Sequence, residues 1–412
     1  MDKSTHPSIA RSDGFSLSPI VELVSNCNSQ PNQIKEIGND VESEVFFTAL
    51  ESHRLLNVTH HNIGKNIAYF SSPVQTIWNQ KYTANKYRIL SHVGELYAVL
   101  GIFSKHNIEA ISLKGPMLSL RYYDDYTLRE CNDLDILVRL SDVEQAFQLL
   151  KNRGYELSEI ALKTPKQIEI YFQNYHHYCL YNAERGIQIE LHWQLFSSQN
   201  YSIYEKSEYW SRTEIIKIAG LNVLVLSKYD NFLYLCIHGG THQWNRMFWV
   251  YDIVRIIFAE EKKFVENVYQ IAIDQKRERF VLQALHLAAI LFKIILPDVI
   301  VEAIKSDKSV QKLSRIAIYN LNTLSDVSPS FNLNTLSVSV KKIFNHYTSV
   351  YYLGGISGIL YHVRKTFINP SFWHIYSFGD QYFVLNYLAA PFMGVYLSLK
   401  NTYTKTFKNH EK

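Results

Sequence analysis

Two aspartates interrupt an apolar segment of the sequence and have the spacing to bind a cation together. In 129-RECNDLDILVRL-140, Asp133 and Asp135 flank Leu134 and precede the rest of an expected strand. Side chains two positions apart in a strand lie on the same side, so the two carboxylates should lie close together. Unpaired at the edge of an apolar core, they would lose solvation and repel each other. A divalent cation would remove that cost, and Mg²⁺ binds such carboxylates together with substrate phosphates.

Three further residues extend this pair into a candidate site. Glu190 interrupts the apolar strand expected for 187-IQIELHW-193 and would be the third carboxylate of a site for two metal ions. Lys114 and Gly115 form a turn between the short strand expected at 109–113 and a helix with proline in its first turn. In such a turn the backbone, the lysine and a helix N-terminus can contact phosphate. The set predicts a site for a nucleoside triphosphate and Mg²⁺, with Mn²⁺ as an alternative ion.

Each of these residues also has a purely structural interpretation. The two aspartates could be neutralised by Arg121, Arg129 or Asn132, and Glu190 could belong to an ion pair. Lys114 could simply extend from a strand end into solvent. We favour the metal site because the acids and the Lys-Gly turn occur together, and we expect Arg129 to contact the triphosphate.

Several histidines could lie near the same site. His192 follows Glu190 by two positions, so it should share its strand face and either touch substrate or hydrogen-bond an acid. His238, His242 and Arg246 recur every four residues, a spacing that would place them on one face of an expected helix lining a nucleotide cleft. A zinc site of the H-x-x-x-H type would need a further acid that the sequence does not identify.

Three residues near this histidine segment are expected to be structural. Asp252 could form an ion pair with Arg246 or Arg255. Trp244 and Trp249 could stack on a base, but the core is the more common place for such side chains.

The pattern of apolar residues predicts strands and helices around the candidate site. We expect two further strand pairs, 176–182 with 187–193 and 213–219 with 222–227. Ser141 and Glu144 have the spacing of a capping box for the next helix. Ser227 and Asp230 cap the first of the helices that follow the last strand.

At 412 residues, the chain exceeds the length at which a single core usually stops growing, so we expect several parts. Residues 1–40 are rich in Ser, Asn, Pro and Gln and are expected to form a loose leader. Residues 41–107 show helical periodicity and predict an N-terminal helical layer. Residues 108–226 hold the strands and the candidate site, and residues 227–412 are expected to form a helical C-terminal domain, whose histidine face should close one wall of the cleft.

The composition excludes some classes of protein. With 47% hydrophobic and 19% charged residues, the chain has the composition of a folded globular protein. Its 42 basic and 38 acidic residues give a net charge of +4, which is no strong signal for a nucleic acid or an acidic membrane. The four cysteines are widely spaced, so neither a zinc knuckle nor a disulfide framework is expected.

No segment is expected to cross a membrane. The first residues lack the apolar run of a secretory signal, so we expect a cytoplasmic protein. The most apolar late segment, 382-YFVLNYLAAPFMGVYLSL-399, approaches spanning length but contains Asn386 and Pro391. We expect it to form a buried or interface-lying helix, without membrane association.

The order of these motifs resembles that of one known family. The motifs are LKGPMLSLRYYDDYTLRECNDLDILV (113–138), Gly154-Tyr155, IELHW (189–193) and HGGTHQWNRMFWVYDI (238–253). Over about residues 95–260, the chain resembles the uncharacterised bacterial nucleotidyltransferase family of the polymerase-beta superfamily. The resemblance implies an α+β fold, in which a minimal nucleotidyltransferase mixed sheet carries N-terminal helices and a helical C-terminal domain.

The resemblance also implies roles for the site residues. Asp133 and Asp135 match the D-x-D motif whose acids bind metal in the family, and Glu190 matches the third acid, which is usually Asp. The superfamily's usual Gly-Ser turn is Lys114-Gly115 here, a pair that is common in the family itself.

We therefore expect transfer of a nucleoside monophosphate from a triphosphate to an acceptor hydroxyl on a small molecule, peptide, sugar or protein, with release of pyrophosphate. The alternatives are a toxin-like transferase that modifies tRNA or protein, and a nucleotide-binding module that has lost catalysis. The near-neutral charge argues slightly against RNA. Because the two aspartates should repel each other, we also expect Asp135→Asn to leave the metal-free protein as stable as before.

Overall fold

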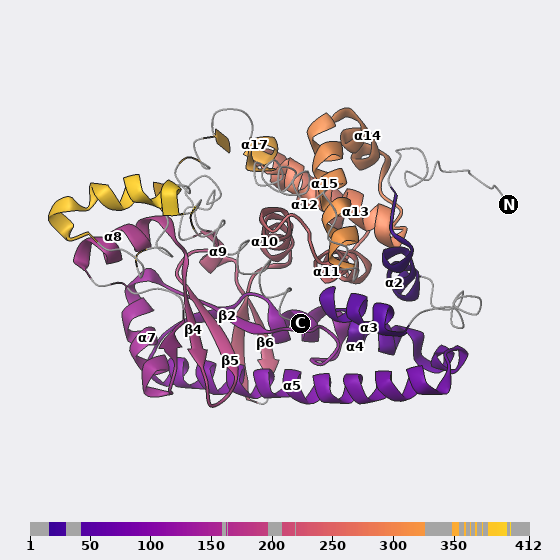
Figure 1. Cartoon of the computed structure of the whole chain (residues 1–412), viewed down its shortest axis with the longest axis horizontal. Coiled ribbons are helices and arrows are strands. Elements are labelled where there is room, and N and C mark those ends of the chain that lie inside the picture. Colours follow the sequence, from indigo (N-terminus) through magenta and orange to yellow (C-terminus); the bar gives the residue numbers. More distant parts are fainter. Residues whose placement is uncertain are drawn as a thin grey trace.

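One mixed sheet forms the centre of the structure (Figure 1). The computed structural model describes residues 16–29, 43–158, 162, 164–196, 208–218, 220–325 and 348–353, and some of those from 358 to 396. Within these residues the sheet has seven strands in the order β3-β4-β5-β2-β1-β7-β6. They are β1 (Ala110–Ser112), β2 (Asp133–Val138), β3 (Glu156–Leu157), β4 (His177–Asn182), β5 (Ile187–His192), β6 (Glu214–Ile218) and β7 (Leu221–Val225).

The pairing of the strands combines local hairpins with parallel neighbours. β4 and β5 form one antiparallel hairpin and β6 and β7 another, as the sequence predicted. β2 runs antiparallel to β1 but parallel to β5, and β1 runs parallel to β7. The mixed sheet, with helices before and after it, confirms the α+β prediction.

The N-terminal helices form a layer that extends beyond the expected one. They are α2 (Pro19–Ser29), α3 (Ser43–Ser52), α4 (Leu56–Ile63) and the long α5 (Ser72–Lys105), which runs beneath the sheet in Figure 1. α2 lies within residues 1–40, where we expected a loose leader, and this part of the prediction was wrong. The helix forms because its apolar residues, Val21 and Val24 among them, are fully buried in the main core.

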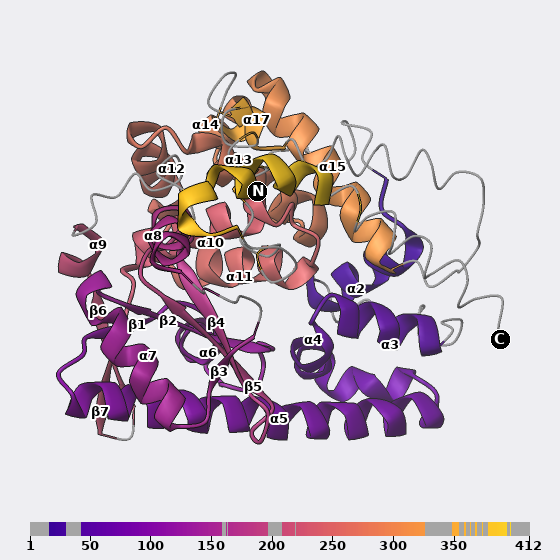
Figure 2. The ribbon, with the colours of Figure 1, turned by 60° about the vertical axis from the view of Figure 1, so that its left-hand side comes forward.

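The two faces of the sheet pack against different helices because side chains alternate along each strand. Ile136 of β2 belongs to the core that β2 shares with α5 and α7 (Val143–Asn152). Its neighbour Leu137 belongs to the other core, together with α6 (Gly115–Tyr123) and the helices after residue 227. Asp135 has the parity of Leu137, so it points to the face on which those later helices lie (Figure 2).

A bundle of helices covers that face. Its members are α10 (Lys228–Thr241), α11 (Met247–Ala259), α12 (Phe264–Asp274), α13 (Glu278–Phe292), α14 (Asp298–Ser306), α15 (Lys308–Ser325) and α17 (Thr348–Leu353). α13 is buried on all sides from residue 280 to residue 292 and is the central helix of the bundle. Among the helices that the structure describes, none combines the length and the apolarity that a membrane span requires.

The late apolar segment 382–399 is only partly described. Residues 384–393 are helical, and this helix lies beside α8 (Pro165–Asn174) in Figure 1. Phe383 packs against Ile170 of α8, whereas Phe392 is exposed. The expected burial is therefore one-sided in this part, and most of the remainder of the segment lies outside the described residues.

Two of the expected helix starts differ in outcome. Ser227 caps α10 as predicted, because its side chain accepts a hydrogen bond from the backbone N–H of Asp230. The prediction of a capping box formed by Ser141 and Glu144 was wrong. A short 3₁₀ turn, Leu140–Asp142, precedes α7, and Asp142 at the N-cap makes no side-chain capping bond.

A turn, and not a continuous helix, connects His238 to Arg246. α10 ends at Thr241, and Gln243 and Trp244 both adopt left-handed backbone conformations, with φ of 56° and 48°. The Trp244 indole folds back onto α10, where it is fully buried and donates a hydrogen bond to Gln283. Gly239 makes this possible because a side chain there would occupy the same space as the indole.

This packing predicts that Gly239→Ala destabilises the protein. A Cβ at position 239 would lie 2.5 Å from the Trp244 ring, so the ring must move, at a cost of about 1–3 kcal/mol. Gly94→Ala in α5 is the matched control, because no atom lies within 4 Å of its Cβ position and alanine favours helix by roughly 0.5–1 kcal/mol. Denaturant unfolding should show the two changes acting in opposite directions, and equal stability of the two variants would contradict the packing argument.

Candidate active site

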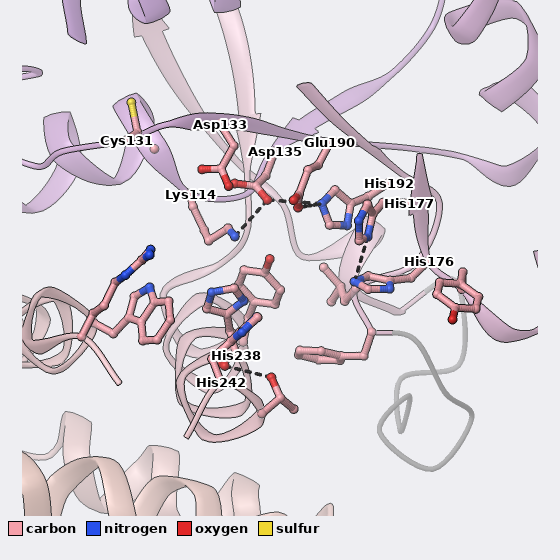
Figure 3. A pocket seen from close by; sticks show the side chains of 18 of the residues that line it. Lys114, Cys131, Asp133, Asp135, His176, His177, Glu190, His192, His238 and His242 are labelled. Carbon is pink, nitrogen blue, oxygen red and sulfur yellow. Dashed lines mark hydrogen bonds and ion pairs between the residues drawn. The ribbon is translucent and has the colours of Figure 1, made fainter. Parts of the chain in front are cut away.

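The three acids expected from the sequence lie on one face of two neighbouring strands. β2 and β5 are parallel and in register, so that Asp135 lies directly beside Glu190. Asp133 lies two positions earlier in β2, on the same face. All three line a cavity of about 620 Å³ that also contacts α10 and the start of α11 (Figure 3). This volume falls within the range of roughly 300–1,000 Å³ that is usual for small-molecule sites.

Two basic side chains, Lys114 and His192, already contact this acidic group. Lys114 Nζ lies 2.9 Å from Asp135 Oδ1. His192 Nε2 lies 3.3 Å from the same oxygen and 3.3 Å from Glu190 Oε2, so an N–H there donates to both acids. Burial alone would disfavour the charged side chains, but these contacts raise the pKa of Lys114 and of His192 and hold the pKa of Glu190 well below its usual value.

These contacts change the expectation for Asp135→Asn. We assumed that the aspartates repel each other without compensation, and this premise was wrong, because Asp135 is buried against Lys114 and His192. Removing its charge leaves Lys114 buried without its ion-pair partner, which destabilises the metal-free protein. Asp133 is different: it is partly exposed and forms no ion pair within the described residues.

The turn before α6 brings Lys114 and backbone amides to the acids. Lys114 is the N-cap of α6, and Gly115 follows it with φ of 60°, a left-handed conformation that glycine adopts without strain. A Cβ at Gly115 would lie 3.9 Å from the backbone oxygen of Asp133, so the turn runs close beside β2. Both residues line the cavity, as the sequence predicted for a phosphate-binding turn.

Among the residues that the structure describes, two overlapping groups of side chains could hold a metal ion. Asp135, Glu190 and His192 each have a ligand atom within 4.8 Å of the others, and their carboxylate oxygens suit Mg²⁺ or Mn²⁺. His176, His177 and His192 form the second group, with His176 Nε2 lying 3.2 Å from His177 Nδ1. Burial lowers the pKa of His177 to about 4 and that of His176 well below its usual value, so both imidazoles are neutral at pH 7.

The sequence did not single out His176 and His177. A signal was present, because the expected hairpin of 176–182 with 187–193 determines which residues face one another. In the structure His177 pairs with His192 across β4 and β5 and therefore shares the face of Glu190.

The helical wall of the cavity carries the other expected histidines. His238, His242 and Arg246 all line the cavity, but the prediction that they share one helix face was wrong, since α10 ends before His242. Figure 3 shows His238 and His242 across the cavity from the acids. The ring of Trp249 lies 5.4 Å from that of His238 and also lines the cavity, whereas Trp244 is in the core.

Arg129 has a structural partner that the sequence did not reveal. Its guanidinium forms a bidentate ion pair with Asp252 of α11, with N–O distances of 2.9–3.0 Å, and both side chains are buried. Tyr123 also donates to Asp252, so Arg246 and Arg255, its expected partners, are not its ion-pair partners. Arg129 still lines the cavity, but its charge is already compensated.

The other groups that could have neutralised the aspartates have different partners as well. Arg121 forms an ion pair with Glu214, and the side chain of Asn132 accepts a hydrogen bond from Arg88. Arg54 is another cavity residue that the sequence did not single out; it follows α3 and reaches the cavity from the N-terminal layer.

The buried pair predicts that Asp252→Asn lowers stability by about 3–5 kcal/mol, since it leaves the Arg129 charge buried and uncompensated. Glu109→Gln, which breaks the exposed pair with Arg139, is the matched control and should cost less than about 1 kcal/mol. Urea unfolding of the two variants gives the comparison. An Asp252→Asn protein as stable as the control would show that this pair does not connect α11 to the segment before β2.

Comparison with known proteins agrees with this geometry. The family described as uncharacterised nucleotidyltransferase matches residues 39–293, which is more than half of the chain and includes the acids, the Lys-Gly turn and the histidine wall. No curated protein and no solved structure matches the chain. The extent of the match shows that the chain belongs to this uncharacterised nucleotidyltransferase family.

Proposed function

We propose that the protein transfers a nucleoside monophosphate from a nucleoside triphosphate to an acceptor hydroxyl, in a reaction that depends on Mg²⁺ or Mn²⁺. The observation that carries the proposal is the in-register placement of Asp135 beside Glu190, with Asp133 on the same face of the cavity. Bound divalent ions would activate the acceptor oxygen and neutralise charge on the leaving pyrophosphate. Asp133, Asp135 and Glu190 would hold these ions.

The residues around the acids support binding and orientation of the substrate. Lys114 and the left-handed Gly115 place a cation and a helix N-terminus beside the acids, where a phosphate group would be bound. His192 contacts both Asp135 and Glu190 and would position their carboxylates. His238, His242 and Trp249 form the opposite wall, where a base or an acceptor group could stack.

The sharpest test uses Asp133→Asn. The variant should fold as well as the wild-type protein, because Asp133 is partly exposed and forms no ion pair within the described residues. Loss of one metal-binding charge should lower pyrophosphate release from nucleoside triphosphates by about 100-fold or more. Release should be measured with each of the four nucleoside triphosphates, in Mg²⁺ and in Mn²⁺, beside thermal melting of both proteins.

Asp298→Asn provides a control of equal charge change on the exposed first turn of α14, and its activity should equal that of the wild-type protein. Mg²⁺ or Mn²⁺ should also raise the melting temperature of the wild-type protein but not that of Asp133→Asn, which tests the metal site without any turnover. A wild-type protein that binds the ions and the nucleotides yet releases no pyrophosphate when small-molecule, sugar, peptide and protein hydroxyl acceptors are supplied would exclude transfer to these acceptors and leave a nucleotide-binding module.

A further inference from the structure

Within the described residues, two arginines of the cavity form no ion pair. Four lysine or arginine side chains line the cavity, namely Arg54, Lys114, Arg129 and Arg246. Lys114 is paired with Asp135, and Arg129 with Asp252. Arg54 and Arg246 form no side-chain hydrogen bond or ion pair in the described part of the chain, although both are partly buried.

The backbone holds these two arginines near each other although they are far apart in the sequence. The residue before Arg54, His53, accepts two hydrogen bonds from the start of α11. The backbone N–H of Phe248 donates to the His53 carbonyl oxygen at 3.3 Å, and the backbone N–H of Met247 donates to His53 Nδ1 at 3.4 Å. Met247 in turn directly follows Arg246. The end of α3 and the start of α11 are thus joined at the positions beside the two arginines.

Aromatic rings support the two guanidinium groups without neutralising them. The Arg54 guanidinium lies 5.4 Å from the centre of the Phe248 ring, and the Arg129 guanidinium lies 5.2 Å from the same ring. The Arg246 guanidinium lies 5.8 Å from the ring of Trp249. Such contacts orient a guanidinium and leave its N–H groups available for an anion.

This arrangement is unfavourable in the absence of a ligand. Burial and the charge of Arg246 lower the pKa of Arg54 to about 10. Arg54 also has a left-handed backbone conformation, with φ of 53°, which costs a non-glycine residue free energy. Asp133 attracts Arg54 electrostatically but forms no ion pair with it in the part of the chain that the structure describes. An anion with several charges would remove the repulsion.

We propose that Arg54 and Arg246 form a subsite for the outer phosphates of the nucleoside triphosphate, the part that leaves as pyrophosphate. The inference rests on the proposed function, and it adds a substrate-binding role for the N-terminal helical layer. The forked N–H groups of arginine bind phosphate oxygens in pairs, and two such groups match the charge of a pyrophosphate unit. The acids and Lys114 then bind the metal ions and the reacting phosphate.

The test compares Arg54→Gln and Arg246→Gln with Arg139→Gln, which removes an exposed arginine outside the cavity. Isothermal titration with inorganic triphosphate in Mg²⁺ should show binding weakened about tenfold or more in each cavity variant and unchanged in the control. Binding of a nucleoside monophosphate should change little in all three variants, because it lacks the outer phosphates. Arg54→Lys should recover part of the triphosphate affinity.

Stability separates this role from a structural one. Removing one of two neighbouring like charges should leave the ligand-free Arg54→Gln protein as stable as the wild-type protein, or more stable. Arg54→Gln and Arg246→Gln proteins that bind inorganic triphosphate as the wild-type protein does would overturn the subsite. Normal pyrophosphate release together with that result would leave the proposed function intact. Weakened triphosphate binding in the variants, with no release by the wild-type protein when the hydroxyl acceptors are supplied, would keep the subsite and reject transfer to these acceptors.

Discussion

The contact between Asp135 and Glu190 on parallel strands is the constraint on which the site depends. Two carboxylates in register on a buried sheet face require positive charge nearby, and the chain supplies it in two ways. Lys114 reaches Asp135 from the N-cap of α6, and His192 contacts both acids from the end of β5. The strand–turn–helix unit before β2 therefore has an electrostatic role as well as a topological one.

These contacts also affect how a metal ion would bind. An ion held by Asp135 would share that carboxylate with Lys114, so its charge would weaken the Lys114–Asp135 attraction. The lysine charge is then available to a phosphate group at the same place. In the proposed function, Lys114 therefore couples metal binding to triphosphate binding. In the metal-free site Asp135 is already ion-paired and is not simply a vacant metal ligand.

The cavity needs both of its walls, and buried contacts connect them. One wall is the sheet, and the other is formed by α10 and the start of α11. The Arg129–Asp252 pair joins the segment before β2 to α11, and His53 joins the N-terminal layer to the same helix. Because these contacts exclude water and link separate parts of the chain, the distance between the walls is fixed by the core and not by the loops.

Sequence reasoning was effective where the signal is local. Strand parity placed Asp133 beside Asp135, and the hairpin pattern predicted the strand that carries Glu190, because both depend on residues within a few positions of each other. It was ineffective where distant segments meet. The partner of Arg129 lies 123 positions away, and Arg54 lies at the cavity where the preceding residue, His53, accepts a hydrogen bond from the start of α11. The turn after α10 depends on Trp244 filling the space above Gly239, which no helical periodicity shows.

The resulting distribution of charge favours one orientation of substrate. Acids are concentrated on β2 and β5, neutral imidazoles lie beside β5 and across the cavity, and the arginines without acidic partners follow α3 and precede α11. A metal-bound triphosphate carries positive charge where it meets the acids and negative charge along its outer phosphates, so it matches this pattern in one direction only. Without bound ions, Asp133, Asp135 and Glu190 would repel a triphosphate, so in the proposed function the ions and the arginines together determine where its outer phosphates bind.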